Sequence, residues 1–437
     1  MMNLFFLVLE IAIYGFSLYL FLYKKELGIL YLPVLFFAYS VITSVLPIEA
    51  FYGVITLLLV SFFKSKYKLL NENVFSFAIF LYFLILLTQA SETIKLSLVF
   101  SVLAFFISLP LINAIYKDHT RDTILKELTT SALIILVVFI ANVLCATVFR
   151  YAPKSMYGIS SGVLYGNMQF TDFNVLGVAL FVVLISILKK NNLLLLSIYV
   201  VAIACIMLTL RRSVMLVSAL GIPFAFLSTL SQQAAKKVIL FMGVFCLIGF
   251  GVYSHSDFAS VFKERYELRN LEDRALEEEK RFIEYELLYQ DMFVLKEYSP
   301  WFGYQLFNSE NNYGKGIFYD RSLHGDLTSI AHSSGLLGVA LYLLMIFTAF
   351  YKALRASKSK NDLVTLFYAT VAFGIYTITG RFTQADCMLL LFLVANLPLA
   401  RVTEDTNTGE TESRPAPIIK YLKPKADEKQ KAALETN

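Results

Sequence analysis

Long stretches without a charged residue recur along nearly the whole chain, and they limit what it can fold into. These stretches are 14 to 25 residues long, and about 20 apolar residues cross the hydrocarbon core of a bilayer as a helix. A soluble chain would need more polar surface, because only 16% of the 437 residues are charged, against about 25% in an average soluble protein. The pattern predicts an all-α, polytopic integral membrane protein with about 12–13 transmembrane helices.

Thirteen segments are predicted to span the membrane. Only Arg211 and Arg212 separate 193–210 from 213–230. One continuous helix over both would be roughly 57 Å long at ~1.5 Å per residue, far more than a ~30 Å core, so the two arginines are predicted to form the tip of a helical hairpin. The predicted spans are 4–23, 27–46, 50–63, 74–91, 96–116, 129–149, 175–188, 193–210, 213–230, 238–253, 327–351, 363–380 and 384–400.

The distribution of lysine and arginine predicts the orientation, since cytoplasmic loops are enriched in both. Alternate loops collect sixteen basic residues on one side and six on the other. The richer side is predicted to be cytoplasmic, which puts the N-terminus outside and the C-terminus inside. The richer side holds Lys24, Lys25, Lys64, Lys66, Lys68, Lys117, Arg121, Lys126, Lys189, Lys190, Lys236, Lys237, Lys352, Arg355, Lys358 and Lys360; the other holds Lys95, Arg150, Lys154, Arg211, Arg212 and Arg381.

This topology predicts four parts: N-terminal transmembrane helices over 1–253, one long periplasmic loop over 254–326, C-terminal transmembrane helices over 327–401, and a disordered cytoplasmic tail over 402–437. The tail is polar and rich in lysine, as disordered segments are. No chemistry is expected in the tail.

An amphipathic helix is predicted within the long loop, from Arg281 to Glu297 and ending before Pro300. Its apolar residues repeat every three or four positions. This helix is expected to cover the membrane domain as a lid or acceptor platform, with a merely solvated loop helix as the alternative. The apolar residues are Phe282, Tyr285, Leu288, Tyr289, Met292 and Leu295.

Several classes of site are not expected in this chain. There is no glycine-rich phosphate loop and no His/Cys cluster at metal-ligand spacing, so neither a nucleotide nor a metal or other cofactor is expected. The net charge of +5 is modest and its basic residues lie in short loops, which gives no reason to expect nucleic acid. The cysteines lie in apolar stretches and are expected to pack as small apolar residues; they are Cys145, Cys205, Cys246 and Cys387.

The candidate site residues lie on the predicted external face. Arg211 and Arg212 go against the positive-inside trend there, either as an interfacial snorkelling pair or as an anion site, because guanidinium groups match phosphate oxygens. His324 stands just before a span, where an imidazole suits general-base work, although a lone boundary histidine is often structural. Asp326 is close enough to orient it or to act as the base. His332 is predicted to pack or form a hydrogen bond.

The order of these residues resembles the O-antigen ligase/O-antigen polymerase family. His324, followed by Gly335-Leu336-Leu337-Gly338, resembles that family's His and Gly-x-x-Gly signature, although Gly325 stands where Asn, Ser or Gln is usual. Arg212-Ser213-Val214-Met215-Leu216 is similar to its Arg-x-x-x-Leu element. Ser299–Tyr304 resembles its Pro-aromatic-Phe-Gly turn, and Thr171–Asn174 its Asp-Pro-Asn-like helix start.

The resemblance implies a membrane-embedded glycosyltransferase of the GT-C type in the bacterial inner membrane. It implies transfer of a glycan from undecaprenyl diphosphate to an acceptor hydroxyl at the periplasmic face, without metal and with inversion. Arg212 and Arg281, which matches a further external arginine of the family, would bind the diphosphate with help from Arg211, and His324 would be the base. The implied partners are the lipid-linked donor, lipid A–core or another glycan acceptor, membrane lipids and a chain-length regulator.

Three functions remain open. A ligase, slightly preferred because the arginine and histidine elements look more ligase-like, moves a finished polymer onto lipid A–core in lipopolysaccharide biosynthesis. A polymerase adds lipid-linked repeat units to a surface polysaccharide. A transporter of lipid-linked glycans is remote, because it would need charged residues deep in the spans, and most of the predicted spans are clean except for Glu10 near one end of the first.

Overall fold

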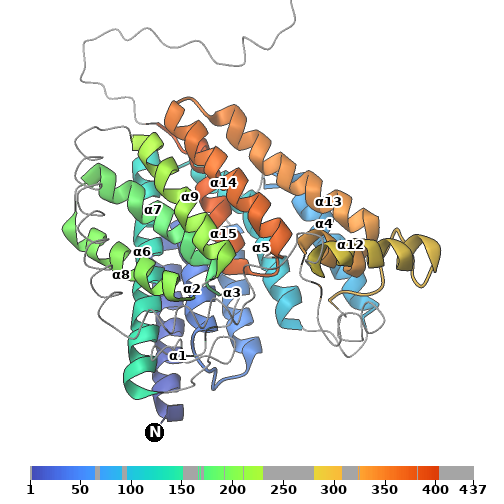
Figure 1. Cartoon of the computed structure of the whole chain (residues 1–437), viewed down its shortest axis with the longest axis horizontal. Helices are drawn as coiled ribbons and strands as arrows, with labels where there is room; N and C mark the ends of the chain where they lie inside the picture. The colour runs from blue at the N-terminus through green and yellow to red at the C-terminus, as the bar shows by residue number, and fades with distance from the viewer. Residues whose placement is uncertain are drawn as a thin grey trace, which may run out of the picture. The chain divides into compact units, whose positions relative to one another are not determined.

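The computed structural model describes residues 2–63, 69–90, 96–150, 166, 168, 172–190, 192–209, 211–229, 280–307, 323, 325–380 and 382–402. The chain divides into two units, Met1–Arg401 and Val402–Asn437, of which the first holds all the described helices. Every regular element among the described residues is a helix, and the β pairings there are two isolated bridges (Figure 1). The predicted all-α class is confirmed.

A helix lies over each predicted span except 238–253, which is outside the described residues. In chain order the elements are α1 (Met2–Tyr19), a π-helix (Leu20–Lys24), a 3₁₀-helix (Lys25–Tyr31), α2 (Leu32–Ser40), α3 (Ile48–Phe63), a 3₁₀-helix (Leu69–Asn71), α4 (Val74–Thr88), α5 (Leu96–Tyr116), α6 (Arg121–Phe149), α7 (Asn174–Lys190), α8 (Leu193–Thr209), α9 (Arg212–Thr229), α12 (Lys280–Tyr289), a π-helix (Gln290–Val294), α13 (Asp326–Ala356), α14 (Lys360–Thr379), α15 (Ala385–Ala395) and a 3₁₀-helix (Leu397–Leu399).

Six helical segments in the described part of the chain are long and apolar enough to cross a membrane. Four further apolar helices have only 10–17 residues, and 17 residues reach about 25 Å, short of a ~30 Å core. The chain is therefore a multi-pass membrane protein by length and composition. Among the described residues, fewer helices have the full length of a crossing than the thirteen predicted spans. The six segments are Leu4–Ser40, Leu96–Tyr116, Arg121–Phe149, Arg212–Thr229, Asp326–Ala356 and Lys360–Thr379.

Two helices, α7 and α15, form the centre of the bundle. All residues from Asn174 to Leu188 in α7 are buried, and so is every residue of α15. A helix that is apolar on all sides belongs in the interior of a bundle, which explains why neither shows a polar face. α7 packs against α6, α8, α9 and α15, and α15 also packs against α2, α5 and α14.

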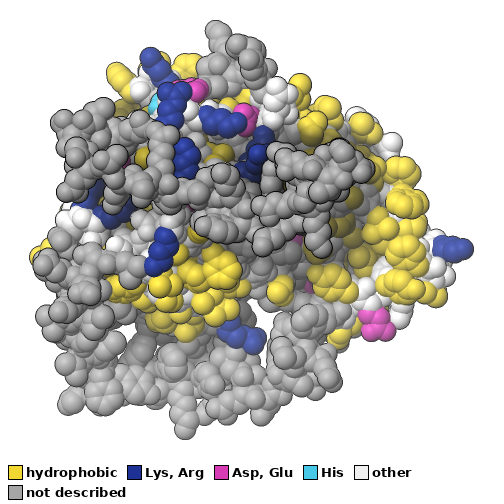
Figure 2. Space-filling view, turned by 90° about the horizontal axis from the view of Figure 1, so that it is seen from above, with side chains coloured by type: hydrophobic (Ala, Val, Ile, Leu, Met, Phe, Trp, Pro, Cys, Tyr) yellow, Lys and Arg dark blue, Asp and Glu magenta, His cyan; other side chains and the backbone are white. Residues whose placement is uncertain are grey.

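Basic residues from distant parts of the chain meet at one end of the bundle, here named the lysine-rich end. Four ion pairs join them there: Lys24–Glu127 (2.7 Å), Lys117–Glu72 (2.7 Å), Lys352–Glu72 (3.4 Å) and Arg121–Asp362. Lysine and arginine side chains gather on the face seen in Figure 2, which is the top of Figure 1. Four of the basic residues predicted to share one side, Lys24, Lys117, Arg121 and Lys352, therefore lie at this end. The start of α1 lies at the opposite end (Figure 1).

The first apolar segment, Leu4–Ser40, turns back on itself near Lys25, whose φ is +49°. Fully buried Glu10 shows this reversal, because its Oε2 accepts hydrogen bonds from the backbone N–H groups of Val45 (2.8 Å) and Leu46 (3.1 Å). The contact ties α1 to the α2–α3 connection. The charged residue that interrupts the first span is thus bound to backbone, as a buried carboxylate must be.

Candidate functional site

Hydrogen bonds join the starts of helices at the end opposite the lysine-rich end. Ser213 Oγ at the start of α9 donates to Asn174 Oδ1 at the start of α7 (3.2 Å), and the Tyr376 hydroxyl near the end of α14 donates to the Asn174 carbonyl (2.7 Å). The Phe382 N–H, just after α14, donates to Asp326 Oδ1 in the first turn of α13 (2.9 Å). The first residues of α7, α9 and α13 therefore lie at one end, where helix N-termini favour anions.

Arg211 and Arg212 occupy the break between α8 and α9 at this end. The helix does not run through them: α8 ends at Thr209 and α9 begins at Arg212. Their side chains differ, because Arg211 is 9% exposed whereas Arg212 is exposed. Arg212 is thus accessible to an anion, and Arg211 is part of the packed interior beneath it.

The turn over 299–303 lies directly on a kink in α13. Gly335 adopts φ +65° and ψ −170° inside that helix, a conformation that only glycine takes without strain. The backbone N–H of Leu336 donates to the carbonyl of Pro300 (2.8 Å). A Cβ on Gly303, whose φ is +77°, would lie 2.6 Å from Gly335 N. Two motifs that are far apart in the sequence therefore interlock through glycine backbone.

His332 lies beside this interlock and is buried. Its ring centroid is 5.4 Å from that of Tyr298 and 5.5 Å from that of Tyr304, and its carbonyl accepts a hydrogen bond from Tyr304 N–H (2.7 Å). Both aromatic contacts come from the segment that carries the turn. The prediction that His332 packs is confirmed.

Glu284 anchors the start of α13 from α12. Its side chain is 1% exposed, and its Oε2 lies 3.1 Å from both the Gly325 N–H nitrogen and Thr328 Oγ1. Gly325 occupies the N-cap position of α13 and has no side chain to cap the helix, so the carboxylate satisfies a backbone donor there and complements the helix dipole. The peptide next to His324 is thereby fixed to α12.

The packed face of α12 differs from the predicted one. Leu288 and Met292 are buried as expected, but Tyr285 and Tyr289 are exposed, and α12 passes into a π-helix that ends at Val294, well before Pro300. The buried residues of this segment are Glu284, Leu287, Leu288, Asp291 and Met292. Leu287, Leu288 and Met292 cluster with Ala331 of α13. The prediction of the buried face from hydrophobicity was therefore wrong for Tyr285 and Tyr289, because the carboxylates of Glu284 and Asp291 are buried instead of these rings.

Tyr285, on the exposed side of α12, lies near two buried carboxylates, Glu284 and Asp326. Burial raises the pKa of its phenol, and the charges of Asp326 and Glu284 raise it further. The Tyr285 hydroxyl therefore stays protonated at neutral pH and remains a hydrogen-bond donor near the start of α13.

Sequence reasoning missed Glu284. The available signal was its spacing of three and four residues before Leu287 and Leu288, which puts all three on one helix face.

Two of the predicted site residues cannot be placed relative to Glu284. His324 lies outside the described residues, and so does the side chain of Arg281, whose backbone is in α12 one turn before Glu284. Asp326 is fully buried and bound to Phe382 N–H.

Neither metal-binding groups in the described part of the chain nor comparison with known proteins identifies a further site residue. Within the described ranges no group of three or more His, Cys, Asp or Glu side chains is arranged to hold a metal ion. Cys145, Cys205 and Cys387 are free thiols, and Cys246 is outside those ranges. No protein-family model and no curated protein matches the chain.

Proposed function

We propose that this protein is a membrane-embedded glycosyltransferase. It transfers a glycan from undecaprenyl diphosphate to an acceptor hydroxyl at the periplasmic face of the bacterial inner membrane, in lipopolysaccharide O-antigen biosynthesis. The observation that carries the proposal is that the starts of α7, α9 and α13 lie at the same end of the bundle, opposite the lysine-rich end, with exposed Arg212 at the start of α9. The starts of α7 and α9 are hydrogen-bonded to each other, and the start of α13 is hydrogen-bonded to Phe382 just after α14. The proposal includes the predicted twelve to thirteen crossings and the periplasmic location of loop 254–326.

The arginines suit the donor. Cleavage of the sugar–phosphate bond develops negative charge on the departing diphosphate, and positioned guanidinium groups stabilise that charge strongly in a site of low dielectric constant. Arg212 and Arg281 are proposed to bind the diphosphate, with Arg211 supporting them from the buried layer. The positive ends of α7 and α9 add to the same field.

His324 is proposed to act as the general base. The acceptor oxygen attacks the anomeric carbon as the bond from that carbon to the phosphate oxygen breaks, the proton passes to the imidazole, and the diphosphate leaves with the bonding electron pair. Such direct displacement inverts the anomeric configuration. Glu284 is proposed to hold the histidine's neighbour, Gly325, in place, so that the imidazole is presented from a fixed helix start.

The proposed acceptor is lipid A–core, as for a ligase; an acceptor glycan extended by lipid-linked repeat units, as for a polymerase working with a chain-length regulator, is the second candidate. Transport of the lipid-linked glycan is disfavoured, because Glu10, the buried acid inside the first apolar segment, is bound by the backbone of the α2–α3 connection.

The surface glycan of a strain lacking this protein tests the function. Removing a ligase is expected to leave lipid-linked polymer in the membrane and bare lipid A–core at the surface. Single repeat units on the core would instead identify the polymerase. An unchanged surface glycan, with no accumulated lipid-linked sugar, would exclude both reactions.

Accessibility of loop 254–326 tests the orientation separately. A single cysteine introduced at Ser309, in a variant without the four native cysteines, is expected to react with an impermeant maleimide in cells whose outer membrane alone is permeabilised. The sixteen-to-six distribution of basic residues is the physical reason. A cysteine at Lys358, at the lysine-rich end, is the matched control and should react only after lysis. The reverse pattern would put the proposed site in the cytoplasm and remove the proposal.

A further inference from the structure

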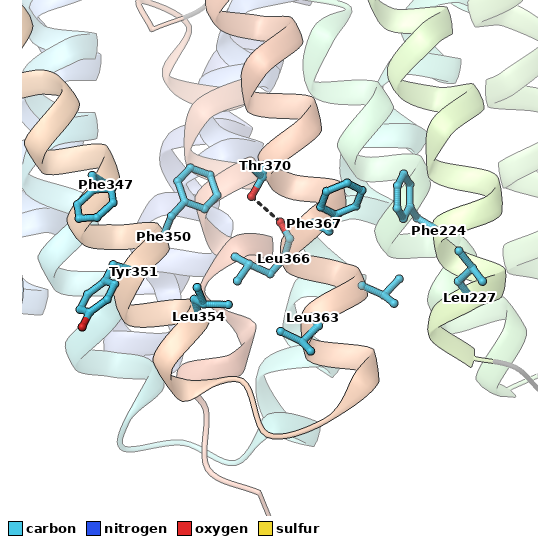
Figure 3. A pocket seen from close by; sticks show the side chains of 11 residues that line it. Phe224, Leu227, Phe347, Phe350, Tyr351, Leu354, Leu363, Leu366, Phe367 and Thr370 are labelled. Carbon is cyan, nitrogen blue, oxygen red and sulfur yellow. Dashed lines mark hydrogen bonds between the residues drawn. The ribbon is translucent and has the colours of Figure 1, made fainter. Parts of the chain in front are cut away.

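Two adjoining hollows lie on the outside of α13 at the lysine-rich end. The first, of about 670 Å³, is an apolar groove between α9, α13 and α14, lined by Phe224, Phe347, Leu354, Leu363 and Phe367 among others (Figure 3). The second, of about 550 Å³, is lined by Lys117, Lys352 and Arg355. Both volumes lie in the range of about 300–1,000 Å³ typical of small-molecule sites.

The two hollows adjoin each other, since Phe347 and Tyr351 line both. Along α13 the cations Lys352 and Arg355 lie near the helix end, whereas the groove also draws its lining from the first turns of α14 and the last turns of α9. A ligand that occupied both would place a charged group at the end of the bundle and an apolar part along its side. A phospholipid in one leaflet has this arrangement, with its charged headgroup at the membrane surface and its acyl chains in the hydrocarbon core.

The charge of the second hollow favours an anion. Glu72 pairs with Lys117 (2.7 Å) and with Lys352 (3.4 Å), so one carboxylate faces two ammonium groups. Arg355 adds a third cation, which is exposed and lies 5.8 Å from the centroid of the Tyr351 ring. Positive charge is therefore in excess where the groove begins.

We propose that these two hollows form one binding site for an anionic phospholipid of the leaflet at the lysine-rich end. The phosphodiester headgroup lies against exposed Arg355, with the charges of Lys117 and Lys352 beside it, and an acyl chain lies in the groove between α9, α13 and α14. Basic pockets between transmembrane helices on the cytoplasmic side bind anionic headgroups in this way. The site is separate from the proposed glycan-transfer site at the other end of the bundle and does not depend on it.

Native mass spectrometry of the purified full-length protein tests this, with phosphatidylglycerol and phosphatidylcholine of identical acyl chains as probes. Phosphatidylglycerol is expected to bind more tightly, and Arg355→Glu to weaken it by roughly tenfold, given about 1 kcal/mol per basic residue near an anionic headgroup. Lys358→Glu makes the same charge change at an exposed position that lines neither hollow and should leave binding unchanged. Equal weakening by both variants, or no preference for phosphatidylglycerol, overturns the proposal.

The groove is tested by Thr370→Trp, which fills it from an exposed position. This variant should weaken binding of both lipids, whereas Val137→Trp, on the exposed surface of α6, should not. Inorganic phosphate at millimolar concentration should fail to displace phosphatidylglycerol. Displacement by phosphate together with unchanged binding by Thr370→Trp would show a site for a soluble anion and would refute the lipid assignment.

Discussion

Glycan transfer is expected to be abolished by Arg212→Ala and by Arg281→Ala, while each variant remains folded and inserted. The diphosphate gains its charge as the sugar leaves, so a positioned guanidinium group stabilises the transition state more than the bound donor. Loss of one such donor typically costs on the order of 10²–10³ in rate, which takes a slow transferase below detection. The measurement is product formation by reconstituted protein with a lipid-linked donor.

Lysine substitutions and Arg211 provide the controls for this prediction. Arg212→Lys and Arg281→Lys should recover part of the activity, because lysine keeps the charge but loses the bidentate geometry. Arg211→Ala should retain more transfer but melt at a lower temperature, since its side chain is 9% exposed whereas that of Arg212 is exposed. An inactive but stable Arg211→Ala together with an active Arg212→Ala would reverse the two roles.

Helix positions could be predicted from the sequence because apolar runs of membrane length leave few alternatives. The boundaries at Thr209 and Arg212 follow directly from the arginine pair that interrupts the apolar run. What hydropathy could not predict is which helices are central and short. α15 has only eleven residues, yet it is buried throughout between α2, α5, α7 and α14.

The site could be predicted only as separate motifs. The sequence marks Gly303 and Gly335 as motif glycines, but their interlock requires the 299–303 turn to rest on the α13 kink, a contact between segments about thirty residues apart. Asn174 and Ser213 are joined by a hydrogen bond that no spacing rule indicates. Such contacts depend on tertiary packing, which cannot be predicted from local sequence patterns.

Glu284 shows the physical reason for the wrong face of α12. Periodicity analysis assigns rings and aliphatic side chains to the core and carboxylates to solvent. A carboxylate is buried when it satisfies unpaired donors, and the start of α13 offers the Gly325 N–H and the Thr328 hydroxyl. The need to satisfy hydrogen-bond donors at this helix start thus overrides the hydrophobic pattern.

His324→Ala is expected to lower the rate of transfer by on the order of 10²–10⁴, the usual cost of removing a general base. Donor binding should be largely retained, since the arginines hold the diphosphate, and chelators should not change turnover, since no metal takes part in the proposed reaction. His332→Ala is the matched control: it removes a buried ring between Tyr298 and Tyr304 and should lower thermal stability more than turnover.

Asp326 is the competing base, and the pH dependence of transfer separates the two residues. An imidazole base loses activity as the pH falls below neutrality, because it becomes protonated, whereas a carboxylate base stays active several pH units lower. Asp326 is fully buried and accepts a hydrogen bond from Phe382 N–H, so Asp326→Asn should chiefly lower stability. Two results together would assign the proton transfer to the aspartate and leave His324 a structural role. The first is near-normal turnover of His324→Ala that still falls at low pH. The second is loss of that fall at low pH in Asp326→Asn.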